Sequence, residues 1–374
     1  MKKVFGILLA VVFGMALLTG CGASDWNPLK QGKELNIAFL GSSGKFEERQ
    51  DFIAGVDLAI KELSEKGVNI KYKLFNDDDN YDNGVTNAKQ VVNDDTYAMA
   101  FTFQSFEIVD TVASLFDEAG KPLFIINGCY DRTMESGYKY VMNLTISAED
   151  GGIALGKYVV NHGYKWIAVA HSNSEYAIDF QEGFNDAVSG SGATNVIDSV
   201  SGPNKATEFD EVWARWQILG VDAVVLSFDD MDWAVELVKM IKEKDPNMMI
   251  LGDQYFNDLS YMNEYGKYLD GMVMPSSYPV DSDAELQRFY DKYEPQVQYL
   301  DITSVTAQGY DLTNMIAKRL ENANSSEEFV EGMLSVEAYD GYTDIKFKQN
   351  GSLDKEPKYW VVKNNVVYRE ESLK

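Results

Sequence analysis

The richest group of oxygen ligands in this 374-residue sequence lies at residues 76–84, NDDDNYDNG. A calcium-binding EF-hand loop requires oxygen ligands at positions 1, 3 and 5, glycine at position 6 and glutamate at position 12. With Gly84 at position 6, Tyr81 falls at position 3 and Gln90 at position 12, and neither meets the requirement. The segment is instead predicted to be a solvated turn whose Asn and Asp side chains cap the next helix, so no metal site is expected.

Residue patterns typical of catalysis are absent from the sequence. It contains no G-x-S-x-G nucleophile elbow, no P-loop and no G-x-G-x-x-G dinucleotide motif. Its two histidines, His162 and His171, are too few for a histidine-rich metal site, and His162 precedes Gly163, where a helix is expected to end. A hydrolase, which would need a nucleophile beside a base in a cleft, is the disfavoured alternative. We therefore expect a protein that is not an enzyme and that needs no cofactor.

The first 21 residues have the layout of a secretory signal. Lys2 and Lys3 precede an apolar run at residues 4–18, which is shorter than the roughly 20 residues that span a bilayer as a helix. The run ends at Leu-Thr-Gly-Cys, which resembles the cleavage site of bacterial lipoprotein precursors. This resemblance implies a signal peptide at residues 1–20, a lipid on Cys21 and a flexible tether at residues 21–31. An ordinary signal peptide with an incidental cysteine is the alternative.

Charge and cysteine content limit the possible partners. The formal net charge is −26. A surface this acidic repels phosphate backbones and anionic lipid headgroups, so nucleic acid is not expected as a partner and membrane attachment must come from the lipid. Lipidation of Cys21 leaves the second cysteine, Cys129, without a disulfide partner. Cys129 is predicted to be a buried small residue or part of a pocket lining rather than a catalytic thiol.

Short apolar runs alternate with segments of helical period, starting at residue 35 and again after Asn143. Strands are expected at residues 35–40, 68–75, 98–103, 123–126, 166–170, 195–200, 223–227, 248–251 and 271–274. Helices are expected at residues 52–63, 83–93, 108–119, 147–162, 177–188, 208–219, 233–243, 282–294 and 304–320, followed by a helix capped by residues 325–328 and a hairpin at residues 358–368. The alternation predicts an α/β fold with parallel sheets covered by helices on both faces, and the length favours two domains.

Polar and aromatic residues follow most of the expected strands. Open α/β sheets bind ligands beyond the carboxyl ends of their strands, so these positions are the candidates for a site. They are residues 41–46, 77–79, 104–105 and 127–130 in the first domain and residues 171–176, 228–230 and 253–255 in the second. The set contains no nucleophile paired with a base, which favours a binding cleft over an active site.

Several segments, in their order and spacing, resemble the Leu/Ile/Val-binding-protein family of type I periplasmic binding proteins, which serve ABC importers of amino acids. They are residues 75–79, 88–94, 118–123, 136–140, 171–176 and 339–343, and the resemblance covers nearly all of the mature chain. It implies two doubly wound parallel-sheet lobes joined by three crossovers. Lobe 1 would comprise residues 32–145 and 277–340, and lobe 2 residues 146–276 and 341–374.

The resemblance also implies a ligand held between the lobes. The residues that fall in the matching loops are Gln104, Ser105, Asn127, Gly128, Cys129, Tyr176, Phe228, Asp229, Asp253 and Gln254. Family members hold a ligand carboxylate with hydroxyls and backbone N–H groups of the first lobe, and Cys129 stands where Ser or Thr is usual. The family acid that meets the ligand ammonium falls at Gln254, a neutral amide. Asp253 or Asp229 would have to replace it, or the ligand lacks an ammonium group.

Together these features predict an extracytoplasmic solute-binding lipoprotein of an ABC importer, anchored to the cell membrane by the lipid on Cys21. Its ligand would be an amino acid or a similar small polar metabolite, with a branched-chain amino acid as the family default. Hinge closure of the two lobes would present the bound form to the permease, while other subunits hydrolyse ATP. The alternative is a sensor subunit of the same fold that feeds a signalling receptor.

Overall fold

The computed structural model describes residues 26–202, 206–256, 259–276, 284–293, 303–335, 337 and 339–370. The predicted signal peptide and Cys21 lie outside the described residues. The part of the predicted tether that is described is held by the fold: the Asn27 side chain, 3% exposed, donates to the Leu320 and Ala323 carbonyls at 2.6 and 2.9 Å, and Trp26 packs on Phe329. The prediction of a flexible segment up to residue 31 was therefore wrong from Trp26 onward.

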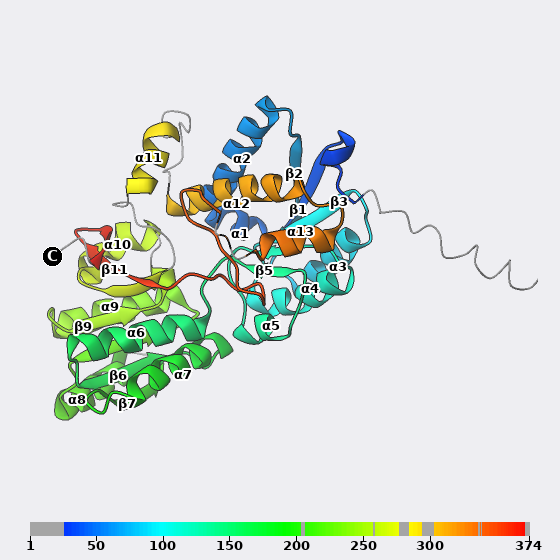
Figure 1. The fold of residues 1–374 in the computed structure, drawn as a ribbon. Coiled ribbons are helices and arrows are strands. Elements are labelled where there is room, and N and C mark those ends of the chain that lie inside the picture. The colour runs from blue at the N-terminus through cyan, green and yellow to red at the C-terminus, as the bar shows by residue number, and fades with distance from the viewer. Residues whose placement is uncertain are drawn as a thin grey trace, which may run out of the picture.

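The first lobe is built on a five-stranded parallel sheet of order β2-β1-β3-β4-β5 (Figure 1). Its strands are β1 (Leu35–Gly41), β2 (Ile70–Asn76), β3 (Tyr97–Thr102), β4 (Leu123–Ile125) and β5 (Val141–Asn143). Its helices are α1 (Ser43–Glu48), α2 (Gln50–Glu65), α3 (Tyr81–Val92), α4 (Phe106–Glu118), α5 (Asp131–Glu135), α12 (Ser304–Leu320) and α13 (Ser326–Met333).

Alternating side chains of β1 enter two separate cores, because successive residues of a strand point to opposite faces of the sheet. Ile37 and Phe39 pack with residues of α2, α12 and α13, whereas Ala38 and Leu40 pack with residues of α3 and α4. Both faces of the sheet are thus covered by helices, as a parallel sheet requires.

The second lobe has a seven-stranded sheet of order β7-β6-β8-β9-β10-β11-β12, parallel except for the terminal hairpin of β11 and β12. The strands are β6 (Trp166–His171), β7 (Asn195–Ser201), β8 (Ala223–Ser227), β9 (Met249–Gly252), β10 (Val273–Ser276), β11 (Lys358–Lys363) and β12 (Val366–Arg369). The helices are α6 (Ala148–His162), α7 (Glu175–Ser189), α8 (Ala206–Leu219), α9 (Met231–Lys244) and α10 (Leu259–Leu269). The hairpin predicted at residues 358–368 is confirmed.

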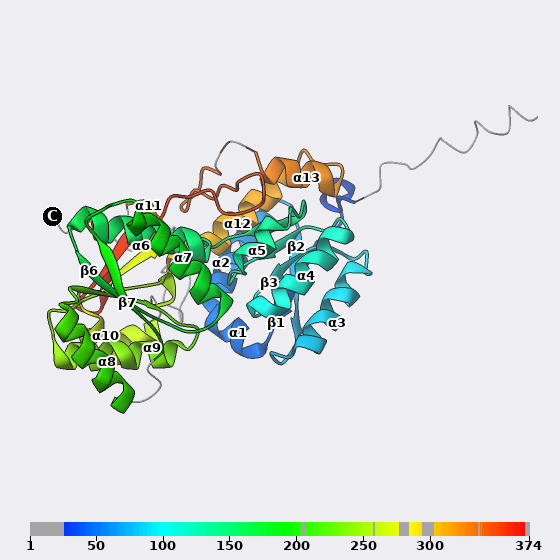
Figure 2. The same cartoon turned by 90° about the horizontal axis from the view of Figure 1, so that it is seen from below.

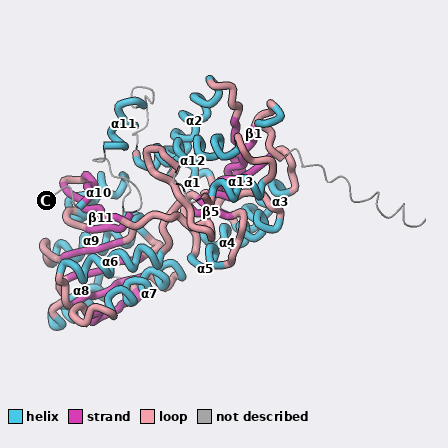
Figure 3. The backbone as a smooth tube through the Cα atoms, viewed as in Figure 1, coloured by secondary structure: helices cyan, strands magenta, loops and turns pink. Residues whose placement is uncertain are grey.

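The chain passes between the lobes three times: from β5 to α6, from β10 towards α11 (Ala284–Tyr293) and α12, and from α13 to β11. Figures 1 and 2 show the two lobes side by side, and Figure 3 shows the connection from β5 to α6 and the described part of that from α13 to β11 as loops. The predicted fold class, two parallel-sheet lobes joined by three crossovers, is confirmed.

The third crossover stays with the first lobe for longer than expected. One carboxylate oxygen of Asp311 on α12 accepts hydrogen bonds from the backbone N–H groups of Tyr342 and Thr343 at 2.7 and 2.6 Å. Ile345 and Phe347 then pack in the core of the first lobe. Residues 341–347 therefore belong with the first lobe rather than with the second, to which residues 341–374 were assigned.

The segment at residues 76–84 is a turn that caps a helix, as predicted. Asp78 and Asp79 have positive φ angles of 55° and 56°, and the Asn80 side chain accepts a hydrogen bond from the Asn83 backbone N–H at 3.1 Å. Within the described part of the chain, no three His, Cys, Asp or Glu side chains gather to hold a metal ion. No helix in the same residues has the length and apolar character needed to cross a membrane.

Candidate functional site

A cleft of about 760 Å³ lies between the lobes, within the usual size range of small-molecule sites. First-lobe residues that line it are Lys45, Glu48, Arg49, Gln104, Ser105, Phe106, Ile126, Asn127, Tyr130, Thr145, Val305 and Gln308. Second-lobe residues that line it are Ser174, Tyr176, Phe228, Asp229, Asp230, Met231, Asp232, Gln254, Tyr255, Ser276 and Trp360. Many of them follow strands directly, because the carboxyl ends of the strands in both sheets face this gap.

Seven of the ten residues proposed for the site line this cleft, namely Gln104, Ser105, Asn127, Tyr176, Phe228, Asp229 and Gln254. The remaining three, Gly128, Cys129 and Asp253, are not part of its lining. Each of the three is excluded for a different physical reason.

Cys129 is buried in the core of the first lobe, where it packs among residues of α3, α4 and β4. Burial, with the nearby Asp131 and Asp110 carboxylates, raises the pKa of its thiol far above the ordinary value. Its assignment to the ligand site was wrong. The alternative interpretation, a small buried residue, agrees with the structure.

Gly128 allows the two lobes to approach each other closely and does not line the cleft. Its φ is +98°, and an added Cβ would lie 3.0 Å from the Thr145 hydroxyl oxygen and 3.1 Å from the Tyr255 hydroxyl oxygen. Tyr255 belongs to the second lobe and donates a hydrogen bond to the Asn127 carbonyl oxygen at 3.2 Å. Glycine at position 128 therefore leaves room for this contact between the lobes.

Asp253 lies beneath the cleft and is 1% exposed. Its Oδ1 accepts a hydrogen bond from the Tyr255 backbone N–H at 2.9 Å, while its Oδ2 has no partner among the described residues. Burial raises the pKa of this carboxyl to about 7. Of the two acids considered as replacements at Gln254, only Asp229 lines the cleft, where it accepts hydrogen bonds from the Ser174 and Ser172 hydroxyls at 2.7 and 3.2 Å.

The amide side chains of Gln104 and Asn127 are already engaged within the first lobe. Gln104 accepts from the Thr102 hydroxyl at 3.0 Å and donates to the Asp77 carboxylate at 2.8 Å. Asn127 accepts from Arg49 Nε at 2.8 Å and donates to the Phe103 carbonyl at 2.9 Å. Both amides therefore fix the shape of the cleft wall.

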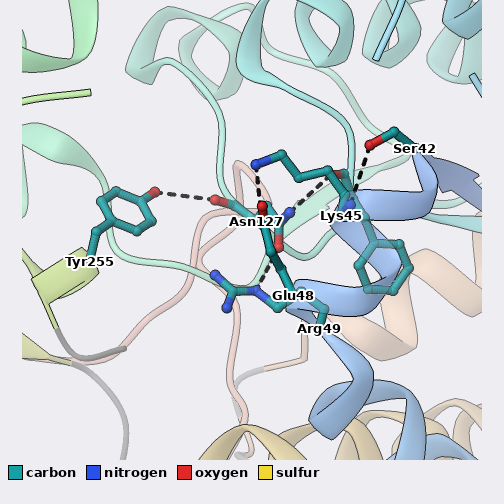
Figure 4. A network of polar contacts seen from close by, with 7 residues as sticks. Ser42, Lys45, Glu48, Arg49, Asn127 and Tyr255 are labelled. Carbon is teal, nitrogen blue, oxygen red and sulfur yellow. Dashed lines mark hydrogen bonds and ion pairs between the residues drawn. The ribbon is translucent and has the colours of Figure 1, made fainter. Parts of the chain in front are cut away.

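Sequence reasoning missed the cationic part of the first-lobe wall. Lys45 and Arg49 line the cleft, and Lys45 pairs with Glu48 at 2.9 Å (Figure 4). Lys45 falls in the predicted post-strand segment 41–46, but Arg49 lies beyond it because the short helix α1 was not expected. The only sequence signal for this cation was that Arg49 is a basic residue close after segment 41–46.

The two walls of the cleft carry opposite charge. The first-lobe wall has Lys45 and Arg49, with Glu48 paired to Lys45, and the second-lobe wall has Asp229, Asp230 and Asp232. Asp230 also caps α9, since its side chain accepts from the Trp233 N–H at 3.0 Å. Such an arrangement suits a small ligand with an anionic group and a cationic group at opposite ends.

Aromatic rings also line the cleft. The ring of Phe106, from the first lobe, meets that of Tyr130 at 5.5 Å and that of Tyr176 at 5.8 Å, and Tyr176 meets Tyr255 at 5.6 Å. Tyr176 and Tyr255 come from the second lobe, so the ring contacts cross between the lobes. These rings supply apolar surface for the body of a ligand.

Several solved structures share this two-lobed fold. A crystal structure of an ABC transporter substrate-binding protein from Desulfitobacterium hafniense in complex with leucine matches with 16% identity and a TM-score of 0.78, covering 90% of this chain and 100% of that chain. A branched-chain amino acid transporter substrate-binding protein from Streptococcus pneumoniae in complex with isoleucine matches with 16% identity, a TM-score of 0.73 and coverage of 90% and 98%. A solute-binding protein from R. palustris in complex with 4-hydroxybenzoate matches with 15% identity, a TM-score of 0.76 and coverage of 90% and 96%.

At these identities the structural matches establish the fold alone, and no functionally curated protein matches the sequence significantly. The family model for periplasmic binding proteins, however, matches residues 37–363. The predicted resemblance to type I periplasmic binding proteins is thereby confirmed. The chain belongs to the periplasmic binding protein family, whose members bind solutes and are not enzymes.

Proposed function

We propose that this chain is the extracytoplasmic solute-binding lipoprotein of an ABC importer and that its ligand is an amino acid or a closely related zwitterion. The observation that carries the proposal is the opposite charge of the two cleft walls, Arg49 on one and Asp229 on the other. Two of the similar structures hold leucine and isoleucine, which carry both charges. The R. palustris protein holds 4-hydroxybenzoate, which has no ammonium group, so the acidic wall favours the amino acid.

Ligand capture would proceed by closure of the lobes. A ligand bound to one wall of an open form gains contacts to the other wall on closure, and its binding energy shifts the equilibrium towards the closed form. Closure also removes water, which strengthens each polar contact. The hydrogen bond from Tyr255 to the Asn127 carbonyl joins the two lobes, so opening of the cleft would break it.

Asp229→Asn tests the proposed role of the acidic wall. A thermal-shift screen of the twenty amino acids and benzoate first identifies those that raise the melting temperature of the wild type. For these amino acids, Asp229→Asn should weaken binding about 10- to 100-fold in calorimetry, because a charge-assisted hydrogen bond to the ammonium is lost.

Asp210→Asn is the matched control, since Asp210 pairs with Lys244 on the surface of the second lobe at 2.8 Å. It should bind the same amino acids as the wild type does. The proposal fails if no amino acid stabilises the wild type, or if Asp229→Asn and Asp210→Asn bind equally well.

The lipoprotein part of the proposal rests on the Leu-Thr-Gly-Cys sequence that ends at Cys21. Lipid on this residue would hold the cleft near the permease and raise its effective concentration there. Cys21→Ser should move the protein from the membrane fraction to the soluble fraction of fractionated cells. Retention of the variant in the membrane would contradict the lipid anchor.

A further inference from the structure

We propose that Arg49 binds the anionic group of the ligand and that Asn127 is its positioning residue. This inference rests on the proposed function, because it names the residue that would recognise one end of the ligand. The family resemblance led us to expect that hydroxyls and backbone N–H groups in the loops after β3 and β4 would meet the anionic group. The structure instead places a guanidinium on the first-lobe wall and uses the loop amide to hold it (Figure 4).

The polar side chains in the loops expected to bind the anion are mostly engaged by protein partners. Both side-chain atoms of Asn127 and of Gln104 have protein partners, as described above. Cys129, expected near the position of a hydroxyl donor, is buried in the core. Ser105 lines the cleft and its hydroxyl can donate a hydrogen bond, but a hydroxyl carries no charge to balance an anion.

Arg49 has the chemistry that these residues lack. Its Nε donates to Asn127 Oδ1 at 2.8 Å, which leaves the two terminal nitrogens of the guanidinium for another acceptor. No carboxylate of the described residues forms an ion pair with it, whereas Arg132 pairs with Asp110 and Arg215 with Asp198. The nearby Glu48 is paired with Lys45. The guanidinium is half-buried, and no acid of the described residues pairs with its terminal nitrogens, although the chain has a net charge of −26. It is therefore suited to a bidentate contact with a carboxylate.

Asn127 links this anion site to lobe closure. Its side chain fixes Arg49, and its backbone carbonyl accepts the hydrogen bond from Tyr255 of the second lobe at 3.2 Å. Figure 4 shows Asn127 joined by dashed lines to both Tyr255 and Arg49. The residue that orients the anion receptor is therefore also a contact point between the lobes, so a shift of Asn127 affects both.

The test compares acids with their amides. The probes are the amino acids that stabilise the wild type in the screen and the matching primary carboxamides, which keep the ammonium but lack the carboxylate. Wild-type protein should prefer the acid by about 10- to 100-fold in calorimetry. Arg49→Met should lose this preference, and Arg49→Lys should keep part of it, because lysine retains the charge but not the planar fork. Asn127→Asp places a competing carboxylate beside Arg49, so it should weaken the binding of acids more than the binding of amides.

Arg215→Met is the matched control, because Arg215 pairs with Asp198 and does not line the cleft. It should keep the wild-type preference. The inference is overturned if Arg49→Met prefers the acid over the amide as strongly as the wild type does. If Arg49→Met does not fold, the same criterion applies to Arg49→Lys. Amino acid binding by the wild type without preference over the amide would also overturn it, while leaving the solute-binding function intact. Failure of the wild type to bind any amino acid would overturn the proposed function and this inference with it.

Discussion

At the scale of single residues, two acids that follow consecutive strands, Asp229 after β8 and Asp253 after β9, differ sharply in their surroundings. Asp229 lies at the cleft surface with two serine hydroxyls donating to it, whereas Asp253 is buried below with one oxygen unpartnered among the described residues. Desolvation disfavours the charged form of a carboxylate, which is why burial raises the pKa of Asp253 from 3.8 to about 7. Ionised Asp253 therefore lowers the free energy of unfolding at every pH at which it is charged.

This cost predicts a pH-dependent effect of Asp253→Asn. Between about pH 4 and pH 7 the folded protein keeps a proton on Asp253 that the unfolded chain releases, so the free energy of unfolding falls as the pH rises through this range. Asparagine can still accept from the Tyr255 N–H and has no charge to bury. The free energy of unfolding of the variant, relative to that of the wild type, should therefore increase by about 2–4 kcal/mol from pH 5 to pH 8. Urea unfolding at both pH values measures this, and an equal difference at both would contradict it.

Residue identity after a strand was predictable, but side-chain direction was not. The sequence places Phe228, Asp229, Asp253 and Gln254 just after two expected strands, and three of these four line the cleft. Whether one residue faces the cleft or the sheet below depends on how the chain leaves the strand. Arg49 was missed for a related reason, since six residues of α1 separate it from the end of β1 and carry too few apolar positions to reveal a helix.

At the scale of elements, each lobe contains one helix pair that packs unusually closely through glycine. An added Cβ at Gly55 of α2 would overlap with the Thr306 carbonyl oxygen of α12, and one at Gly152 of α6 would overlap with the Phe180 carbonyl oxygen of α7. Glycine lets the helix backbones approach directly, and the atoms met are backbone atoms that cannot rotate away. These contacts fix helices that carry cleft residues, since Tyr176 lies on α7.

Gly152→Ala should therefore destabilise the protein by about 1–3 kcal/mol through overpacking. Gly190→Ala is the matched control, because Gly190 ends α7 with φ −76° and no atom within 4 Å of an added Cβ among the described residues. The control should be neutral or slightly stabilising. Thermal unfolding of the two variants measures the difference, and equal melting temperatures would show that the α6–α7 contact adjusts freely.

Most of the long elements were predictable because they carry both periodicity and end signals, although the 11-residue helix α10 was not expected. The helix expected at residues 304–320 matches α12, and the Ser147 and Ser325 caps mark the starts of α6 and α13 as predicted. The short elements α1, α5 and β5 were not expected, since five or six residues cannot display a helical period and three cannot display a strand alternation. Of these short pieces, α1 and α5 follow β1 and β4 at the carboxyl end of the first sheet, where the cleft is formed, and β5 is the edge strand of that sheet.

At the scale of the molecule, the lobes meet through a few polar contacts outside the ligand-lining core. Arg132 of the first lobe pairs with Glu175 of the second and with Asp110 of its own lobe, the latter at 3.2 Å. The Asp131 carboxylate accepts hydrogen bonds from the Ala148 and Glu149 N–H groups at 3.1 and 2.9 Å, at the first crossover. The Asp131 hydrogen bonds lie at the crossover itself and do not require the lobes to be close. The Arg132–Glu175 ion pair does require it.

Glu175→Gln should therefore weaken ligand binding by acting on closure alone. The pair is exposed, with side-chain exposures of 47% for Arg132 and 35% for Glu175, so its loss is worth about 0.2–1 kcal/mol and raises the Kd by about 1.5- to 5-fold. Screening by salt predicts that the difference from the wild type shrinks as the ionic strength rises from low salt to about 0.5 M. Because Glu175 does not line the cleft, the preference for acids over amides should stay unchanged.

The matched control is Glu327→Gln, since Glu327 pairs with Lys139 within the first lobe at 2.9 Å and cannot report on closure. Calorimetric titration of both variants with one amino acid at two salt concentrations separates the outcomes. A Glu175→Gln effect that persists at high salt would point to a packing change in α7 rather than to loss of the ion pair. An effect shared with Glu327→Gln would show that any lost surface charge weakens binding and would remove the Arg132–Glu175 pair from the closure mechanism.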